Sequence, residues 1–444
     1  MNKKKKIKRS LNFSIVDGSF YSAMSGFGDA FFSAFAIFLR ATNMQLALLS
    51  ALPQTFGSIM QIFTSDVLRI FKNRKVMACV FAFLQSLMYL PIAFVFLMGE
   101  FKVYYLIILV CFYWLFALFP TPAWNSWMGD LINENKRGKY FGRRNKIVSM
   151  ASFVSFLGAG FVLQALTNGW TAIVGFVTLF LLAFLFRFIS FLFLLGQYEP
   201  GYSTEDGKDI TFFRFLKKAK YTNYGLFVIF LTLMNFSVYV CAPFIAPYFL
   251  RDIGFDYKIY TILLATSVLV RIIMMPLWGK LIDRYGTKKV LTLSAFIMPL
   301  NPLLLILNQN LFYLILVQAF SGFVWSGFEL SSYSFIFDTT EAAKRTKYIS
   351  YYNVINGVMI FIGALLGAFI MKNFSLFGSA FNSVFLMSFV LRYAVVFFFI
   401  TKIHEVRIVR HISYKNLLIK SLRLKPHRGF LHHNLLINFR GKHK

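Results

Sequence analysis

The sequence has few acidic residues: 17 Asp and Glu stand against 47 Lys and Arg, which gives a formal net charge of +30. Charged residues of both signs make up only 14% of the chain, whereas 58% of it is hydrophobic. A water-soluble protein of this size could not bury so much apolar surface, so we expect the chain to lie in a membrane. The basic residues gather in the N-terminal run, in short loops and after Lys402. Because this pattern is typical of cytoplasmic loops, we expect no nucleic acid as a partner.

Cysteine and histidine are also scarce where chemistry would need them. The three cysteines (Cys79, Cys111 and Cys241) lie inside apolar runs, which favours packing over disulfide bonds. All six histidines follow Lys402, so none is available within a membrane segment. The sequence contains no Walker loop and no His-Glu-x-x-His motif. We therefore expect no enzyme, no metal site and no cofactor.

Twelve apolar segments are long enough to cross a bilayer as a helix, which takes about 20 residues. They cover residues 18–40, 45–68, 75–98, 103–128, 146–168, 170–196, 224–250, 258–282, 288–307, 311–336, 349–372 and 379–402. These segments predict an all-α membrane protein in two six-helix parts. The predicted parts are an N-terminal bundle 1–196, a cytoplasmic linker 197–223, a C-terminal bundle 224–403 and a basic cytoplasmic tail 404–444. The tail from Ile412 is either a basic amphipathic helix on anionic lipid or a disordered segment.

One loop motif occurs twice. Asp130, Arg137, Tyr140 and Asn145 recur as Asp338, Arg345, Tyr348 and Asn353, always 208 positions later. Two apolar halves with the same loop indicate an internally duplicated membrane protein, which is typical of transporters with a substrate site between the halves. Because Lys and Arg gather on one side of the predicted membrane segments, we expect both termini in the cytoplasm.

The loop between the eighth and ninth segments carries a more specific pattern. Residues 279–289 read Gly-Lys-Leu-Ile-Asp-Arg-Tyr-Gly-Thr-Lys-Lys. This run resembles the signature loop of the major facilitator superfamily, Gly-x-x-x-Asp-Arg-x-Gly-x-Lys/Arg-Lys/Arg. The first-half copy departs from it, because alignment places Arg69 where Asp283 stands and moves the acid to Asp66.

The loop 129–145 is similar to that of a bacterial permease subgroup of unassigned substrate. Motifs typical of sugar porters and of drug antiporters are absent; for example, Gly158-Ala159-Gly160 lacks a Gly-Pro pair. The resemblance covers essentially the whole chain. It implies the superfamily's fold, with twelve helices in two pseudo-symmetric bundles, and a monomer in the bacterial cytoplasmic membrane.

Charges inside the apolar segments are candidates for function, since each is costly unless paired or hydrated. Asp29 and Arg271 lie near the middle of the first and eighth segments. The resemblance implies that these helices line or flank the central cavity, where the two residues could bind substrate, carry protons or pair. Packing within their own halves is the alternative. Glu329 is a second candidate proton carrier, or a structural residue near the inner gate.

Further candidates for the substrate or proton site are polar and aromatic residues in the fourth, seventh and tenth segments. They are Trp124, Asn125, Asn235 and Trp325. Prolines in the fourth and seventh segments predict bent helices, as cavity-lining helices tolerate. Arg187 and Arg392 each lie ten residues before the end of their segments. We interpret this pair as architecture, with side chains bending toward the interface.

Charged loop residues could form a cytoplasmic gate by pairing across the two halves. The predicted gate residues are Arg69, Asp130, Arg137, Asp283, Arg284, Asp338 and Arg345. A static clamp at the helix ends is the alternative.

These observations favour a secondary active transporter of a small organic solute, working by rocker-switch alternating access. Proton coupling and an anionic or amphipathic substrate are open hypotheses. The alternative is a non-transporting membrane scaffold or receptor that retains the fold. The partners expected are a small-molecule substrate, protons and membrane lipids.

Overall fold

The computed structural model describes residues 3–132, 137–166, 170–200, 212–340, 342–376, 378–407, 409–410 and 412–422. Within these ranges the chain is almost entirely helical, and the one β-bridge joins Leu376 to Ser379. Eleven helical stretches of the described chain are long and apolar enough to cross a membrane. The predicted all-α membrane fold is therefore confirmed.

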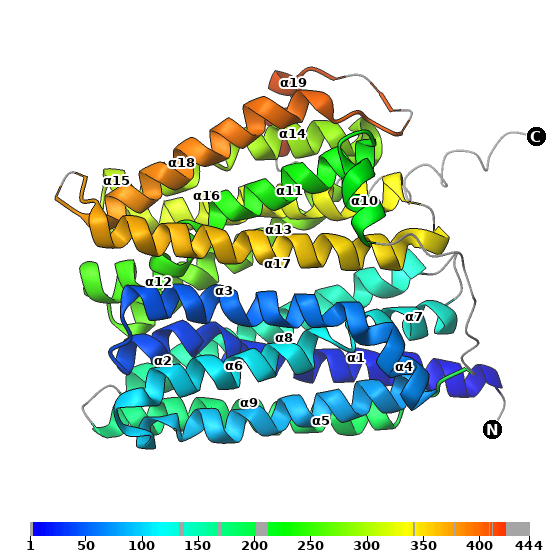
Figure 1. Ribbon diagram of the computed structural model, residues 1–444, viewed down its shortest axis with the longest axis horizontal. Coiled ribbons are helices and arrows are strands. Elements are labelled where there is room, and N and C mark those ends of the chain that lie inside the picture. Colours follow the sequence, from blue (N-terminus) through cyan, green and yellow to red (C-terminus); the bar gives the residue numbers. More distant parts are fainter. Residues whose placement is uncertain are drawn as a thin grey trace, which may run out of the picture.

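The first half of the chain forms one set of packed helices (Figure 1). In chain order it contains α1 (Lys3–Phe27), α2 (Phe32–Phe38), α3 (Asn43–Met60), α4 (Thr64–Phe71), α5 (Arg74–Ala93), α6 (Lys102–Leu118), α7 (Thr121–Leu131), α8 (Arg137–Ala165) and α9 (Trp170–Leu195). The interruption between α6 and α7 contains Pro120, and Pro122 lies in the first turn of α7, where the sequence predicts a bend.

The second half repeats this arrangement. It contains α10 (Phe212–Ala219), α11 (Asn223–Tyr239), α12 (Ile245–Pro247), α13 (Tyr257–Tyr285), α14 (Thr287–Ile297), α15 (Leu300–Leu307), α16 (Leu311–Thr339), α17 (Ala342–Asn373), α18 (Ala380–Phe399) and α19 (Tyr414–Leu422). Pro243 and Pro247 lie in the short turns that follow α11. The predicted linker 197–223 contains the helix α10. Residues 201–211 of the linker lie outside the described part of the chain.

Helix α1 differs from its prediction at both ends. It begins at Lys3, so the expected start at residue 18 is wrong, because a helix can continue with basic residues beyond the apolar layer. It stops at Phe27, and a 3₁₀ turn, Asp29–Phe31, leads into α2. At the break, a Cβ on Gly28 would lie 2.3 Å from the Tyr89 hydroxyl oxygen. Glycine at this position therefore lets α5 approach the interrupted helix.

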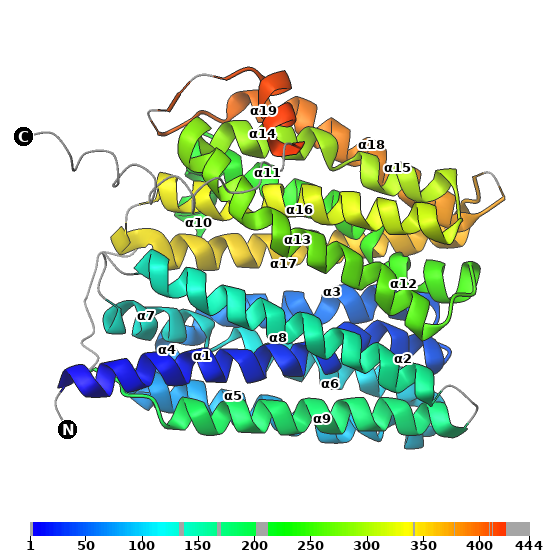
Figure 2. The ribbon, with the colours of Figure 1, turned by 180° about the vertical axis from the view of Figure 1, so that it is seen from behind.

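The two halves lie as two layers, with α1–α9 in one and α11–α18 in the other (Figures 1 and 2). We call the end where α1 begins and α18 stops the terminal end, and the other the far end. At the far end, one apolar cluster joins residues of both halves, including Phe35 and Phe176 of the first and Phe249 of the second. The described clusters nearer the terminal end each belong to one half. The halves are therefore packed together more extensively at the far end.

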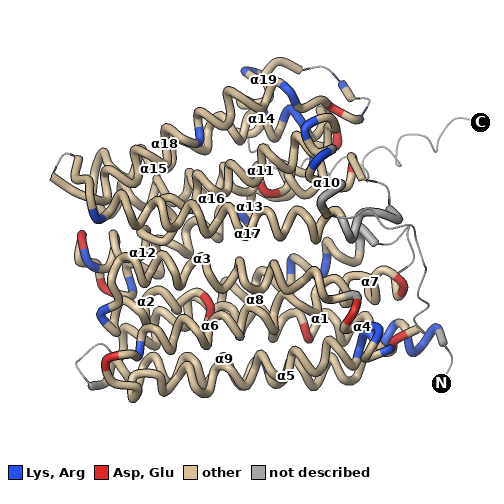
Figure 3. Tube along the Cα trace, viewed as in Figure 1, with Lys and Arg blue, Asp and Glu red and all other residues tan. Residues whose placement is uncertain are grey.

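Charged residues are concentrated at the two ends of the helices (Figure 3). A few lie between the ends, within the apolar length of the helices. These are Asp17, Asp29, Arg187, Arg271, Glu329 and Arg392.

Within the described part of the tail, Tyr414–Leu422 forms the helix α19. In α19, Leu417 is completely buried in a cluster with residues of α13 and α14. Lys420 Nζ donates a hydrogen bond to the Tyr285 hydroxyl at 2.5 Å, and Lys289 Nζ donates to the Ile412 carbonyl at 2.9 Å. This part of the predicted amphipathic tail thus packs on the second half.

Candidate functional site

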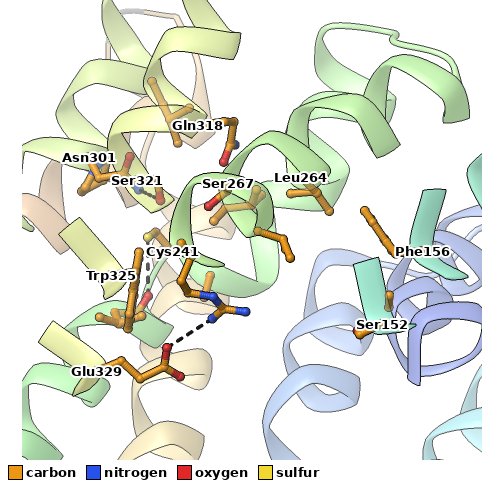
Figure 4. Close-up of a pocket in the computed structure, with 18 of the residues that line it drawn as sticks. Ser152, Phe156, Cys241, Leu264, Ser267, Asn301, Gln318, Ser321, Trp325 and Glu329 are labelled. Atoms are coloured by element: carbon orange, nitrogen blue, oxygen red, sulfur yellow. Dashed lines mark hydrogen bonds and ion pairs between the residues drawn. The ribbon is translucent and has the colours of Figure 1, made fainter. Parts of the chain in front are cut away.

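A cavity of about 500 Å³ lies between the two layers. The first half contributes Ser25 and Gly26 of α1 and Ser152 and Phe156 of α8. Ala30 of the turn after α1 also belongs to the wall, and the remaining residues come from α11, α13, α15, α16 and α18 and the turns that follow α11. Figure 4 shows Ser152 and Phe156 across the cavity from the second-half residues. A pocket bounded by elements of both halves is where a duplicated transporter is expected to bind its substrate.

An ion pair crosses part of the second-half wall. Arg271 Nη1 of α13 lies 3.4 Å from Glu329 Oε2 of α16, and both residues line the cavity (Figure 4). Their side chains are 39% and 36% exposed, so the pair is accessible from the cavity. Trp325 lies one helical turn before Glu329 and lines the same cavity. The structure thus brings together three of the predicted site residues.

Polar residues of α15 and α16 complete this wall, and the sequence analysis did not single them out. Gln318 and Ser321 precede Trp325 and Glu329 on α16 at spacings of three and four residues, which puts all four on one helix face. Asn301 of α15 donates a hydrogen bond from Nδ2 to Ser321 Oγ at 3.3 Å. This spacing of polar residues within an apolar segment was the signal that could have identified them.

Arg392 also lines the cavity, although its position near a helix end suggested an architectural role. The residue is 3% exposed. Its Nη1 donates to the Met298 carbonyl at 3.4 Å, and its Nη2 lies 3.2 Å from Cys241 Sγ. The cavity wall therefore carries two arginines and one glutamate.

Asp29 is held inside the first half. Its Oδ1 accepts hydrogen bonds from the hydroxyls of Tyr89 at 2.6 Å and Tyr113 at 2.5 Å. It is not among the cavity-lining residues, whereas Ser25 and Ala30 on either side of it are. Of the two readings left open for this pair, Arg271 lines the cavity and pairs with Glu329, whereas Asp29 packs within its own half in this conformation.

The remaining predicted site residues lie outside the cavity wall. Asn235 Nδ2 of α11 donates to Asn356 Oδ1 of α17 at 2.6 Å, within the second half. Trp124 of α7 lies under the Arg144 guanidinium, 5.0 Å from it, and Asn125 is exposed. The contacts of Asn235 and Trp124 each connect two helices of one half. None of the three residues lines the cavity.

Ion pairs at the terminal end of the first half converge on Arg74, which the sequence analysis did not select. Arg74 is 1% exposed, and its Nη1 lies 2.7 Å from Asp130 Oδ2. Its Nε lies 3.2 Å from Glu199 Oε1, and the backbone N–H groups of Arg74 and Lys75 donate to the same carboxylate at 2.9 and 3.2 Å. The carboxylate of Glu199 therefore binds the first turn of α5, where the helix dipole favours a negative charge.

The second half has a similar cluster of ion pairs at its terminal end, but its central arginine is Arg407, which follows α18. Arg407 Nη2 lies 2.6 Å from Asp338 Oδ1, and its Nη1 lies 3.8 Å from Asp283. The hydrogen bond to Asp338 raises the pKa of Arg407 further above its usual value. Glu405 accepts from the Lys288 backbone N–H at 2.8 Å, as Glu199 does at the start of α5. Both clusters connect helix ends within one half.

The other predicted gate residues do not bridge the halves where they are described. Arg69 lies 3.9 Å from Asp66, and both side chains are 69% exposed. Arg284 lies over the ring of its neighbour Tyr285. The side chains of Arg137 and Arg345 are outside the described part of the structure. A hydrogen bond that does bridge the halves runs from Asn353 Nδ2 to Gln61 Oε1 at 3.0 Å, and Asn353 belongs to the repeated motif.

Comparison with known proteins supports the assignment that the motifs suggest. The Major Facilitator Superfamily model matches residues 225–439. The class B tetracycline resistance protein of Escherichia coli is 33% identical over 110 residues, which is 25% of this chain and 27% of that protein. The class H tetracycline resistance protein of Pasteurella multocida is 31% identical over 108 residues, covering 24% and 27%. The matched segments thus span about a quarter of these relatives.

Solved structures match over nearly the whole chain. A D-xylose–proton symporter superposes with a TM-score of 0.70 at 11% identity, covering 90% of this chain and 98% of that one. A nucleoside transporter superposes with a TM-score of 0.68 at 14% identity, covering 89% and 100%. At such low identity these matches establish the fold. The family model matches the second half of the chain and the solved structures share the fold across both halves, so the chain is similar to permeases of the major facilitator superfamily.

Proposed function

We propose that this protein is a secondary active transporter that moves a small organic solute across the membrane by alternating access. The observation that carries the proposal is the cavity between the halves, with the Arg271–Glu329 ion pair exposed in its wall. A scaffold would gain nothing from two half-exposed charges at this depth, since charged side chains within a membrane are costly. A solute that binds there would contact elements of both halves.

The distribution of contacts supports a rocker-switch motion. The shared apolar cluster closes the far end, while the described clusters nearer the terminal end belong to single halves. Rotation of one half against the other would separate the far-end cluster and bring the terminal ends together. The predicted gate pairs between halves would belong to that second state. We propose that the terminal end faces the cytoplasm of a bacterial cell and that the protein works as a monomer.

Glu329 is the proposed proton carrier. Its carboxylate is partly exposed to the cavity and is paired with Arg271. Protonation of Glu329 would remove one charge of the ion pair and release the Arg271 guanidinium, so proton and solute binding would be coupled at one site. Asp29, with two tyrosine hydroxyls on one oxygen, is assigned a structural role instead.

The activities of the similar proteins define the first solutes to test. They are tetracycline, D-xylose and nucleosides, and we add organic anions because of the arginines in the wall. Purified protein in proteoliposomes containing a pH-sensitive dye is given each solute with and without a pH gradient. Uptake of a solute above protein-free liposomes, with a change of internal pH, is the expected result.

Variants connect that transport to the cavity. Arg271→Gln and Glu329→Gln should reduce uptake, and Glu329→Gln should abolish its dependence on the pH gradient. Asn125→Ala, an exposed residue outside the cavity wall, is the control and should transport normally. Uptake that is indifferent to both cavity variants would contradict the proposed site. Absence of flux for every solute would favour the scaffold or receptor.

A further inference from the structure

Arg392 is buried without a counter-charge. It lies in α18, is 3% exposed and lines the cavity. A guanidinium has five N–H donors. Here two of its nitrogens have weak partners, the Met298 carbonyl at the long distance of 3.4 Å and the Cys241 sulfur, a poor acceptor, at 3.2 Å. The Nε atom is buried and has no hydrogen-bond partner in the described part of the chain.

The corresponding arginine of the first half, Arg187, makes short hydrogen bonds with its guanidinium and serves as a comparison. Arg187 is 7% exposed, and its Nε donates to Gln85 Oε1 at 2.7 Å. Its Nη1 donates to Ser190 Oγ at 2.7 Å, and Ser190 in turn donates to Asp17 Oδ1 at 2.6 Å. Two short hydrogen bonds and a carboxylate one hydroxyl away therefore stabilise Arg187.

The second half lacks these compensating groups. Ser190 comes three residues after Arg187, whereas Val395 comes three residues after Arg392. Asp17 lies in α1, whereas the corresponding helix, α11, contains no acidic residue. No described carboxylate lies within ion-pair distance of Arg392. A buried charge without a partner destabilises a protein strongly, and a bound anion would remove that cost.

The charge of the cavity wall leads to the same conclusion. Its only charged residues in the described chain are Arg271, Glu329 and Arg392. The first two neutralise each other at 3.4 Å, which leaves the single positive charge of Arg392. The planar fork of a guanidinium binds carboxylate and similar oxyanions with two parallel hydrogen bonds.

We propose that Arg392 is the substrate-binding arginine of the cavity and that the solute is a small organic monoanion. This inference rests on the proposed transport function and specifies its substrate class. Asn301 Oδ1 is buried, unpartnered in the described chain and part of the same wall, so a hydroxyl of the solute donates to it. Trp325 and Phe156 offer apolar contact. The site therefore fits the anion of a hydroxy acid with an apolar side chain.

The test measures thermal stability of the purified protein with four probes: acetate, benzoate, mandelate and mandelamide. Mandelate carries a carboxylate, an adjacent hydroxyl and a ring, and mandelamide is its uncharged counterpart. We expect mandelate to raise the Tm most and mandelamide to leave it unchanged. In Arg392→Gln and Arg392→Met the apparent affinity for mandelate should fall by about 10- to 100-fold, as expected for hydrogen bonds to a charged group. Asn125→Ala should respond like the wild type.

The empty protein provides a second readout that a structural arginine would not give. Arg392→Met removes an uncompensated charge and should raise the Tm without ligand, whereas Arg187→Met breaks a satisfied network and should lower it. No response of the wild type to any of the anions, or an equal response in Arg392→Gln, would overturn the proposal. Uptake of an uncharged solute that still depends on Arg271 and Glu329 would retain the transport function while removing this substrate class.

Discussion

Replacement of Arg74 by methionine tests how the terminal end of the first half is held together. The Arg74 side chain is 1% exposed, its partner Glu199 is 7% exposed and its partner Asp130 is 53% exposed. Removing one member of a buried pair costs about 3–5 kcal/mol, whereas an exposed pair contributes about 0–1 kcal/mol. Glu199 would keep the two backbone N–H donors of Arg74 and Lys75. We therefore expect Arg74→Met to lower the free energy of unfolding by about 2–4 kcal/mol.

The chain offers a matched control five residues away. Arg69 lies 3.9 Å from Asp66 with both side chains 69% exposed, so Arg69→Met should not change stability measurably. Asp130→Asn should lower the free energy of unfolding by about 1 kcal/mol or less, and Glu199→Gln by about 2–4 kcal/mol. The assay is denaturant unfolding in detergent, followed by tryptophan fluorescence. Equal losses for Arg74→Met and Arg69→Met, or for Asp130→Asn and Glu199→Gln, would refute the reasoning.

Three other substitutions test single contacts through the unfolding free energy or the Tm. Asp29→Ala should cost about 2–4 kcal/mol because it leaves the Met24 sulfur, a weak acceptor, as the remaining partner of two buried tyrosine hydroxyls, and Asp29→Asn should cost less; equal costs would contradict this. Gly286→Ala should cost about 1–3 kcal/mol more than Gly99→Ala. Both glycines have positive φ, but only at Gly286 does a new Cβ meet an atom, Glu405 Oε2 at 2.3 Å. Glu329→Gln should change the Tm little, since its ion pair is half exposed; a large drop would indicate a structural role.

The membrane segments could be predicted because each helix that crosses the lipid bilayer needs about 20 apolar residues. A run of this length is directly visible in the sequence. The start of α1 was missed because its first turns are basic and lie outside any such run. Hydropathy thus identifies the apolar part of a helix and not its full length.

The direction of a side chain could not be predicted in the same way. Asp29 follows a break at Gly28, and the 3₁₀ turn after it changes the helical phase, so the depth counted along the helix does not give the direction of its carboxylate. Arg187 and Arg392 have matching positions in the sequence, yet residues far away in the chain give them opposite surroundings. The sequence analysis selected Arg69 and not Arg74 as a gate residue. The burial of Arg74 depends on packing against Glu199, which is distant in the sequence, so no local motif indicates it.

The two carboxylates that bind the first turns of α5 and α14 have a consequence for how the chain is connected. Glu199 and Glu405 each follow the last long helix of their half and return to a helix of that same half. A polypeptide cut after Pro200 would therefore keep every described hydrogen bond and ion pair of the first half intact. Residues 1–200 and 201–444, produced together as separate polypeptides, should associate in the membrane and form the complete cavity.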